Sequence, residues 1–243
     1  MSELKTQTLA EIIERNHSAI RILEKYAIDY CINGNQTLDE ACLEKNISIN
    51  CIIHDLSDGY NTSSQSEFSR MSLTMLIDYI RTKHHLYVEQ QTPILKKHIL
   101  ELEEKFASQH PELRLIKNLF FEISGELIVH MKKEEFILFP FIKKLEKAKG
   151  SDQTVSSPLF AWISNPVNMM MDDHAAEFNK YKKISTLTNH YKAHDPEEQL
   201  LSKTYRLLEQ YEKDLHMHIH LENNILFPKA IMLEKEVNVA GPF

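Results

Sequence analysis

The sequence predicts an all-α protein in which a small helical domain is followed by an up-down-up-down four-helix bundle. The 243 residues include only 5 Gly and 8 Pro, and the segments between them are long and rich in Leu, Ile, Glu and Lys, a composition typical of helical proteins. Four long segments carry apolar residues at helical spacing, which predicts helices that pack along a shared apolar stripe. Before these segments, residues 57–70 lose almost all apolar periodicity, which predicts a linker.

The first third of the chain predicts several short helices. Apolar residues at helical spacing in residues 9–26 end at the D-Y-C-I-N-G stretch of residues 29–34, where Asn33 and Gly34 tolerate the backbone of a turn. Thr37 and Glu40 form a capping box that begins a further helix. We therefore expect a small helical amino-terminal domain at residues 1–58, a linker at residues 59–71 and the four-helix bundle at residues 72–243.

The four bundle helices are expected to be long and to begin or end near proline or glycine. Pro93 lies within the first of them, and we expect it to kink that helix. Pro111 suits the first turn of the second helix, and Gly150 suits its end. The expected helices cover residues 72–109, 111–150, 166–191 and 196 onward.

Charge and hydropathy argue against several classes of partner. The net charge is −7, and no basic block is present that would follow a phosphate backbone, which argues against nucleic acid. No run approaches the roughly 18 apolar residues of a membrane span, and the first residues lack the features of a signal peptide. Three cysteines, at positions 31, 42 and 51, form no disulfide framework and suit a reducing compartment. We expect a cytoplasmic protein that binds no membrane, and a homodimer is left open.

One stretch of sequence occurs twice. Residues 130–140 and 218–228 both fit the template H-x-x-x-E-x-x-I-L-F-P, and they lie 88 residues apart. Residues four apart share a face of an α-helix, so each copy places an imidazole beside a carboxylate. One His/Glu pair alone would more often be an exposed or hydrogen-bonded pair. Here both pairs lie on stripes that are otherwise apolar, and buried polar groups require a partner. A metal ion is the simplest one.

The histidine spacing suggests that the chain is built from two similar halves. His85 precedes His130 by 45 residues, and His174 precedes His218 by 44 residues. Each half would then provide one histidine from its first helix and a His/Glu pair from its second. Four imidazoles and two carboxylates exceed the four ligands of a structural zinc site. Two metal ions bridged by the glutamates would use all six groups, and the ligand types suit iron, manganese or zinc.

The choice between His84 and His85 stays open at this point. On a helical wheel that includes Leu73, Ile77 and Val88, His84 lies nearer the centre of the apolar stripe and His85 lies at its edge.

Together, these motifs resemble the iron-sulfur cluster repair di-iron proteins, which are hemerythrin-like proteins with an amino-terminal D-Y-C domain. The resemblance rests on the doubled H-x-x-x-E-x-x-I-L-F-P motif, on D-D-H at residues 172–174 and on D-Y-C…N-G ahead of the bundle. It covers nearly the whole chain. It implies two non-heme iron ions, bridged by carboxylate and by an oxo or hydroxo group. The ligands that it implies are His85, His130, His174 and His218, with Glu134 and Glu222 as bridges.

The resemblance selects His85 because the family has a ligand histidine seven residues after an aspartate, here Asp78. It also implies a redox or iron-transfer role for the Cys31 thiol. Two departures from the family pattern are visible. Family members often have two adjacent cysteines after Asp-Tyr, whereas this chain has Cys31 and Ile32. Oxygen-carrying hemerythrins have a fifth histidine ligand, and no histidine stands at the matching place here.

The function that the resemblance implies is repair of iron-sulfur clusters damaged by oxidative or nitrosative stress. Iron donation, nitric oxide chemistry or both would carry this out, with damaged iron-sulfur proteins as partners. Nitric oxide and oxygen are the expected small ligands. Two alternatives remain: a nitrogen-oxide reductase, and a sensor that binds nitric oxide or oxygen reversibly. A metal-free structural bundle would bind no iron at all, and whether the chain is an enzyme is left open.

Overall fold

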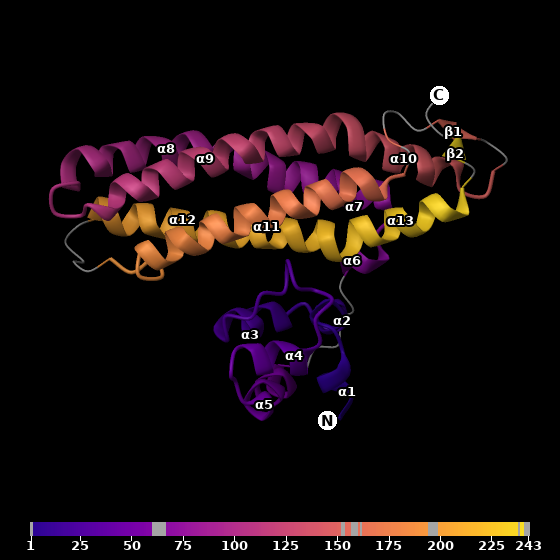
Figure 1. The fold of residues 1–243 in the computed structure, drawn as a ribbon, viewed down its shortest axis with the longest axis horizontal. Coiled ribbons are helices and arrows are strands. Elements are labelled where there is room, and N and C mark those ends of the chain that lie inside the picture. The colour runs from indigo at the N-terminus through magenta and orange to yellow at the C-terminus, as the bar shows by residue number, and fades with distance from the viewer. Residues whose placement is uncertain are drawn as a thin grey trace.

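The computed structural model describes residues 2–59, 67–151, 154–156, 160, 162–193, 199–237 and 239–240, and the statements below refer to these residues. The fold is all-α apart from one parallel pair of two-residue strands, as predicted (Figure 1). These strands are β1 (Val155–Ser156) and β2 (Val239–Ala240), with Val155 opposite Val239. No helix among the described residues is long and apolar enough to cross a membrane.

Four long helical rods form the bundle, and three of them contain a π-helical turn. The rods are α7 (Leu73–Ile80), η1 (Arg81–His85) and α8 (Leu86–Phe106); α9 (Glu112–Lys133), η2 (Glu134–Leu138) and α10 (Phe139–Ala148); α11 (Ser164–Leu187); and α12 (Gln199–Leu221), η3 (Glu222–Leu226) and α13 (Phe227–Glu236). The first rod continues through Pro93. Pro196, where the last helix was expected to begin, lies outside the described residues.

Carboxylates from neighbouring rods help to fix where the bundle helices begin. The Glu146 carboxylate accepts hydrogen bonds from the backbone N–H groups of Leu73 and Thr74, at 2.7 and 2.9 Å. The Glu234 carboxylate accepts one from Ile163 N–H at 2.9 Å, just ahead of α11. The first N–H groups of a helix have no partner inside that helix, so such contacts satisfy them and stabilise the helix ends.

The amino-terminal unit contains five short helices, two of which begin with a capping box. Thr8 and Glu11 form one, and Thr37 and Glu40 form the predicted one. The helices are α1 (Ser2–Thr6), α2 (Leu9–Arg15), α3 (Ala19–Lys25), α4 (Leu38–Glu44) and α5 (Ile49–Gly59). Of the predicted linker, residues 60–66 lie outside the described residues. The rest includes α6 (Glu67–Arg70), whose Phe68 packs against Tyr79 of the bundle. The domain boundaries stay a prediction.

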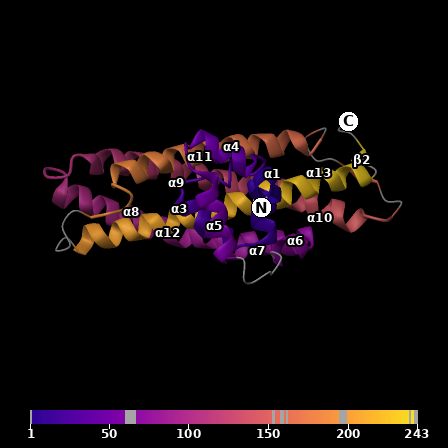
Figure 2. The same ribbon diagram turned by 90° about the horizontal axis from the view of Figure 1, so that it is seen from below.

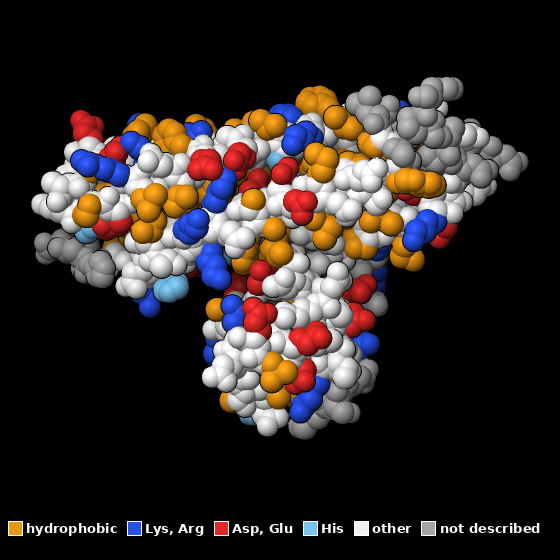
Figure 3. Space-filling view, viewed as in Figure 1, with side chains coloured by type: hydrophobic (Ala, Val, Ile, Leu, Met, Phe, Trp, Pro, Cys, Tyr) orange, Lys and Arg blue, Asp and Glu red, His pale blue; other side chains and the backbone are white. Residues whose placement is uncertain are grey.

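The amino-terminal unit lies against the middle of the bundle, beside α11 and α12 (Figures 1 and 2). The face shown in Figure 3 carries positive and negative side chains intermixed over both parts of the molecule. A mixed surface of this kind agrees with the modest net charge of −7.

The apolar core of the bundle is divided into two clusters. Along the second rod, Leu127 and Met131 belong to one cluster, whereas Leu138 and Phe141 belong to the other. The other three rods change cluster at the corresponding depth. Between the clusters lies a buried layer of histidine and glutamate side chains, so apolar packing closes this layer from both ends of the bundle.

Candidate metal centre

The buried layer contains the six residues that the sequence singled out. The rods bring together two groups that share both glutamates: His85, His218, Glu134 and Glu222 form one group, and His130, His174, Glu134 and Glu222 form the other. Within each group, the potential ligand atoms lie within 4.8 Å of one another. Two groups of potential ligands that share both carboxylates fit a binuclear metal site.

The π-helical turns position half of these residues. His85 is the last residue of η1, Glu134 is the first of η2 and Glu222 is the first of η3. A π turn inserts extra backbone into an α-helix and rotates the residues that follow it, and such turns are frequent at functional sites. For this reason the ideal helical wheel, which favoured His84, was wrong here. The structure places His85 in the cluster, whereas His84 contacts Asp214 through Nδ1 at 3.0 Å.

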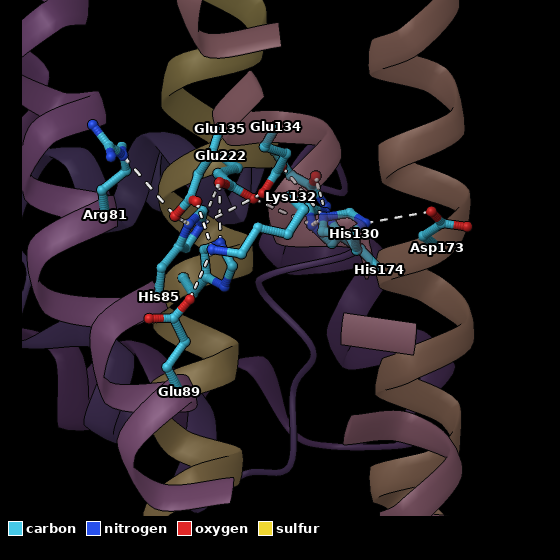
Figure 4. A network of polar contacts seen from close by, with 12 residues as sticks. Arg81, His85, Glu89, His130, Lys132, Glu134, Glu135, Asp173, His174 and Glu222 are labelled. Carbon is cyan, nitrogen blue, oxygen red and sulfur yellow. Dashed lines mark hydrogen bonds and ion pairs between the residues drawn. The ribbon is translucent and has the colours of Figure 1, made fainter. Parts of the chain in front are cut away.

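Every imidazole of the cluster directs Nε2 toward a glutamate oxygen. His130 and His85 approach the two oxygens of Glu134, at 3.3 and 3.5 Å. His218 and His174 approach the two oxygens of Glu222, at 3.0 and 3.2 Å. Figure 4 shows several of these side chains pointing toward one another from different rods.

The donor set fits a pair of metal ions. All six residues are at most 1% exposed. Both oxygens of Glu134 and of Glu222, and Nε2 of His85 and of His218, are buried and make no hydrogen bond with the described residues. Buried polar atoms without partners are costly, at about 1 to 3 kcal/mol each and more when charged. Metal ions between the imidazoles and carboxylates would satisfy all of them.

The imidazoles and carboxylates of the cluster shift one another's pKa values. Burial by itself would lower the pKa of His130, but the Glu134 carboxylate and other nearby carboxylates raise this pKa to about 10. Burial would likewise raise the pKa of Glu134, but His130 and His85 hold it well below its ordinary value. The carboxylates are therefore ionised and His130 carries a proton when no metal is bound. Metal binding would displace that proton.

Three of the four imidazoles have a partner at the opposite ring nitrogen, Nδ1. His85 contacts Glu135 at 2.9 Å, His174 contacts Asn223 at 2.8 Å and His130 contacts Asp173 at 3.3 Å. Such partners fix the orientation and tautomer of a ligating histidine and tune its basicity. Figure 4 shows Glu135 between His85, Lys132 and Arg81.

The sequence reasoning missed Glu135 and Asn223. Each directly follows the glutamate of one motif copy, Glu134 or Glu222. The equivalent position in the repeat was a signal that could have identified both. Asp173 stood in the D-D-H stretch, but only its neighbour His174 was assigned a role.

A cavity of about 460 Å³ between α9 and α11 reaches the cluster at His130. Asp173 and the buried Glu177 also line it. Burial raises the pKa of Glu177 to about 7. The cavity therefore lies against one half of the candidate centre.

Cys31 lies outside both four-residue groups. Its side chain is buried, and its thiol donates a hydrogen bond to the Asp29 carboxylate at 3.4 Å. Burial, followed by the nearby Asp29 charge, raises the pKa of this thiol well above its ordinary value. The residue lines a second cavity, of about 790 Å³, between the amino-terminal unit and α11 and α12. In this arrangement the group is a neutral thiol rather than a thiolate.

Several proteins named for iron-sulfur cluster repair are similar to this chain over most of its length. Residues 5–60 match the family model ScdA_N, described as a domain of unknown function (DUF542). Over 235 residues, the chain is 29% identical to the probable iron-sulfur cluster repair protein of Haemophilus influenzae, covering 93% of this chain and 96% of the relative. It is 27% identical over 227 residues to the iron-sulfur cluster repair protein YtfE of Enterobacter sp. (93% and 97%). With the protein ScdA of Staphylococcus haemolyticus, also named for iron-sulfur cluster repair, it shares 24% over 222 residues (91% and 96%).

Proposed function

We propose that this chain, a homologue of iron-sulfur cluster repair proteins over more than nine tenths of its length, acts in the repair of iron-sulfur clusters damaged by oxidants or nitric oxide. The observation that carries this proposal is the pair of buried four-residue groups that share Glu134 and Glu222. We assign two non-heme iron ions to it, with His85 and His218 holding one, and His130 and His174 holding the other.

The donor set suits iron that is bound reversibly. Each metal ion would have two neutral imidazoles and a share of two carboxylates, so two divalent ions would retain part of their positive charge in the centre. When bound, the iron pair would supply electrons and open coordination positions for a diatomic ligand. The chain's own part is to keep the ligands in place, to exclude bulk water by the apolar clusters on both sides and to hold the proton on Nδ1 of each imidazole that has an acceptor there.

The substrates are damaged iron-sulfur proteins, to which iron would be delivered. We place this activity in the reducing cytoplasm, where Cys31, Cys42 and Cys51 remain thiols. Cys31 would take part in transfer after the amino-terminal unit has moved enough to expose its sulfur, since the docked thiol is buried.

A second candidate function is chemistry or sensing at the same centre with nitric oxide or oxygen. The cavity that reaches His130 supports it, because its volume of about 460 Å³ exceeds what a diatomic molecule needs. A nitrogen-oxide reductase would form nitrous oxide over repeated turnovers. A sensor would bind the ligand reversibly and retain its iron.

The repair function can be tested with the full chain loaded anaerobically with labelled ferrous iron. It is mixed, with and without added nitric oxide, with an electron donor and a client whose [4Fe-4S] cluster has lost one iron by oxidation to [3Fe-4S], and the label in the client and the client's recovered activity are both measured. Repair predicts that label and activity rise together, and that Glu134→Gln abolishes both. Glu89→Gln, at an exposed residue that contacts Lys132 and no cluster histidine, is the control. Nitrous oxide formed over several turnovers without label transfer would instead favour the reductase.

A further inference from the structure

Asn223 contacts both the candidate centre and the amino-terminal unit. Its Oδ1 lies 2.8 Å from Nδ1 of His174, inside the candidate centre. Its Nδ2 donates a hydrogen bond of 3.3 Å to the backbone carbonyl oxygen of Cys31, in the amino-terminal unit. Asn223 is 6% exposed. One side chain therefore bridges a candidate metal ligand and the D-Y-C stretch, which lie far apart in the sequence.

The two contacts depend on each other through the orientation of the amide. An amide has an acceptor on one side and a donor on the other. While Nδ2 faces the Cys31 carbonyl, Oδ1 faces His174 and accepts a hydrogen from Nδ1. His174 is then the tautomer whose Nε2 has a free lone pair, as metal ligation requires. In the opposite tautomer, Nδ1 would be an acceptor and the amide would rotate, placing Oδ1 against the Cys31 carbonyl oxygen.

The neighbouring Asn224 strengthens the same interface without touching the cluster. Its Nδ2 lies 3.1 Å from the Tyr30 carbonyl oxygen, to which it donates a hydrogen bond. Gly34 packs so closely on it that a Cβ at this glycine would lie 2.0 Å from Asn224 Oδ1. Docking of the D-Y-C stretch therefore depends on this pair of asparagines, and only the first of them reaches a candidate ligand.

We propose that Asn223 couples the metal centre to the docking of the amino-terminal unit. The docked Cys31 carbonyl orients the amide, which prepares His174 as a ligand, and a metal ion at Nε2 of His174 strengthens docking in return. Such coupling is reciprocal by thermodynamic necessity. The inference rests on the proposed metal centre but not on the repair activity. It would tie the release of iron from the His130 and His174 pair to exposure of Cys31.

Hydrogen exchange of the full chain, with and without ferrous iron under anaerobic conditions, tests this coupling. In the wild type, we expect iron to slow exchange of the backbone amides of residues 29–34 by about fivefold. Asn223→Asp keeps an acceptor for His174 but sets an oxygen against the Cys31 carbonyl, so exchange there should be fast in both states. Asn224→Ala is the matched control: it weakens docking but should retain the response to iron. If Asn223 only stabilised docking, Asn223→Asp would speed exchange but would keep an iron response equal to the wild type's.

The effect of docking on iron affinity is measured with a substitution in the amino-terminal unit, so that every bundle residue stays unchanged. Gly34→Leu should displace the D-Y-C stretch and weaken ferrous iron binding by about fivefold at one of two sites, as measured by competition with a chelator. Three results would overturn the coupling. The first is hydrogen exchange in the wild type that is the same with and without iron. The others are an iron response in Asn223→Asp equal to the wild type's, and an unchanged iron affinity in Gly34→Leu. A wild type that binds no iron would instead overturn the metal centre itself.

Discussion

The two copies of the H-x-x-x-E-x-x-I-L-F-P motif have the same ligand pattern but different residues beside it. In the first copy, the residue after the glutamate is Glu135, an anion that contacts His85. In the second copy it is Asn223, a neutral amide that contacts His174 and the amino-terminal unit. One residue further along, the first copy has Phe136, which is 73% exposed, whereas the second copy has Asn224, which donates a hydrogen bond to the Tyr30 carbonyl oxygen. The repeat thus conserves the ligand set within this chain while making its two halves chemically unequal.

This difference has a consequence for the two metal ions. A carboxylate contacts Nδ1 of one histidine in each half, Glu135 at His85 and Asp173 at His130. Only the half that contains His174 also contacts another part of the chain, through Asn223. We therefore expect metal affinity at the His85 and His218 pair to respond to Glu135, and metal affinity at the His130 and His174 pair to respond to docking of the amino-terminal unit.

Substitution of a residue that both halves share should disturb metal binding most. Glu134→Gln replaces a carboxylate that lies in both four-residue groups, so we expect loss of both metal ions, with affinity lowered by about 100-fold or more. Metal analysis after gel filtration measures this loss. Glu89→Gln should retain the full metal content. Two tightly bound ions in Glu134→Gln would contradict a bridging role.

The pH dependence of metal binding follows from His130. Its pKa is raised to about 10, so the metal-free centre holds a proton there at neutral pH, and metal binding must release it. Affinity should therefore rise with pH between about 7 and 9, by up to tenfold per unit for each proton released. Calorimetry in buffers of different ionisation enthalpy counts the protons. Binding that releases none would contradict a protonated His130 in the metal-free centre.

A neutral residue at position 135 should weaken metal binding only in the half that contains His85. Glu135→Gln keeps the shape of the side chain but removes the charge that contacts His85 at 2.9 Å. We expect about a tenfold weaker affinity at one metal ion and little change at the other. Chelator competition followed to both metal equivalents resolves the two. Equal weakening at both ions, or no change at either, would contradict the assignment of Glu135 to one half.

The smallest effect on metal binding is expected at Cys31. The thiol lies outside both metal groups, so Cys31→Ser should leave the metal content at the wild-type value while iron transfer to a damaged cluster falls. Cys42→Ser, at another buried cysteine, is the control. Repair at the wild-type rate in Cys31→Ser would remove this thiol from the transfer step.

The sequence was sufficient to predict the four helices, because apolar stripes at helical spacing extend along each of them. The repeated motif and the histidine spacing pointed to His130, Glu134, His174, His218 and Glu222, whereas the resemblance selected His85 over His84. The fold brings all six together. The π turns were not predictable, because nothing in the local residue pattern distinguishes a five-residue π turn from ordinary helix. The π turn η1 determines which of His84 and His85 faces the cluster. The hydrogen bond from Asn223 to the Cys31 carbonyl oxygen was not predictable either, because it forms only when two segments far apart in the sequence pack together.

Two iron ions that share Glu134 and Glu222 would occupy two unequal halves of one centre. Mössbauer spectroscopy of the full chain, loaded anaerobically with ferrous iron, can resolve the two ions. One ion per four-residue group predicts two irons per chain, in equal amounts with two distinct environments, and magnetic coupling once they are partly oxidised. A single iron per chain, or two irons that are magnetically independent, would rule out a pair of ions bridged by these glutamates.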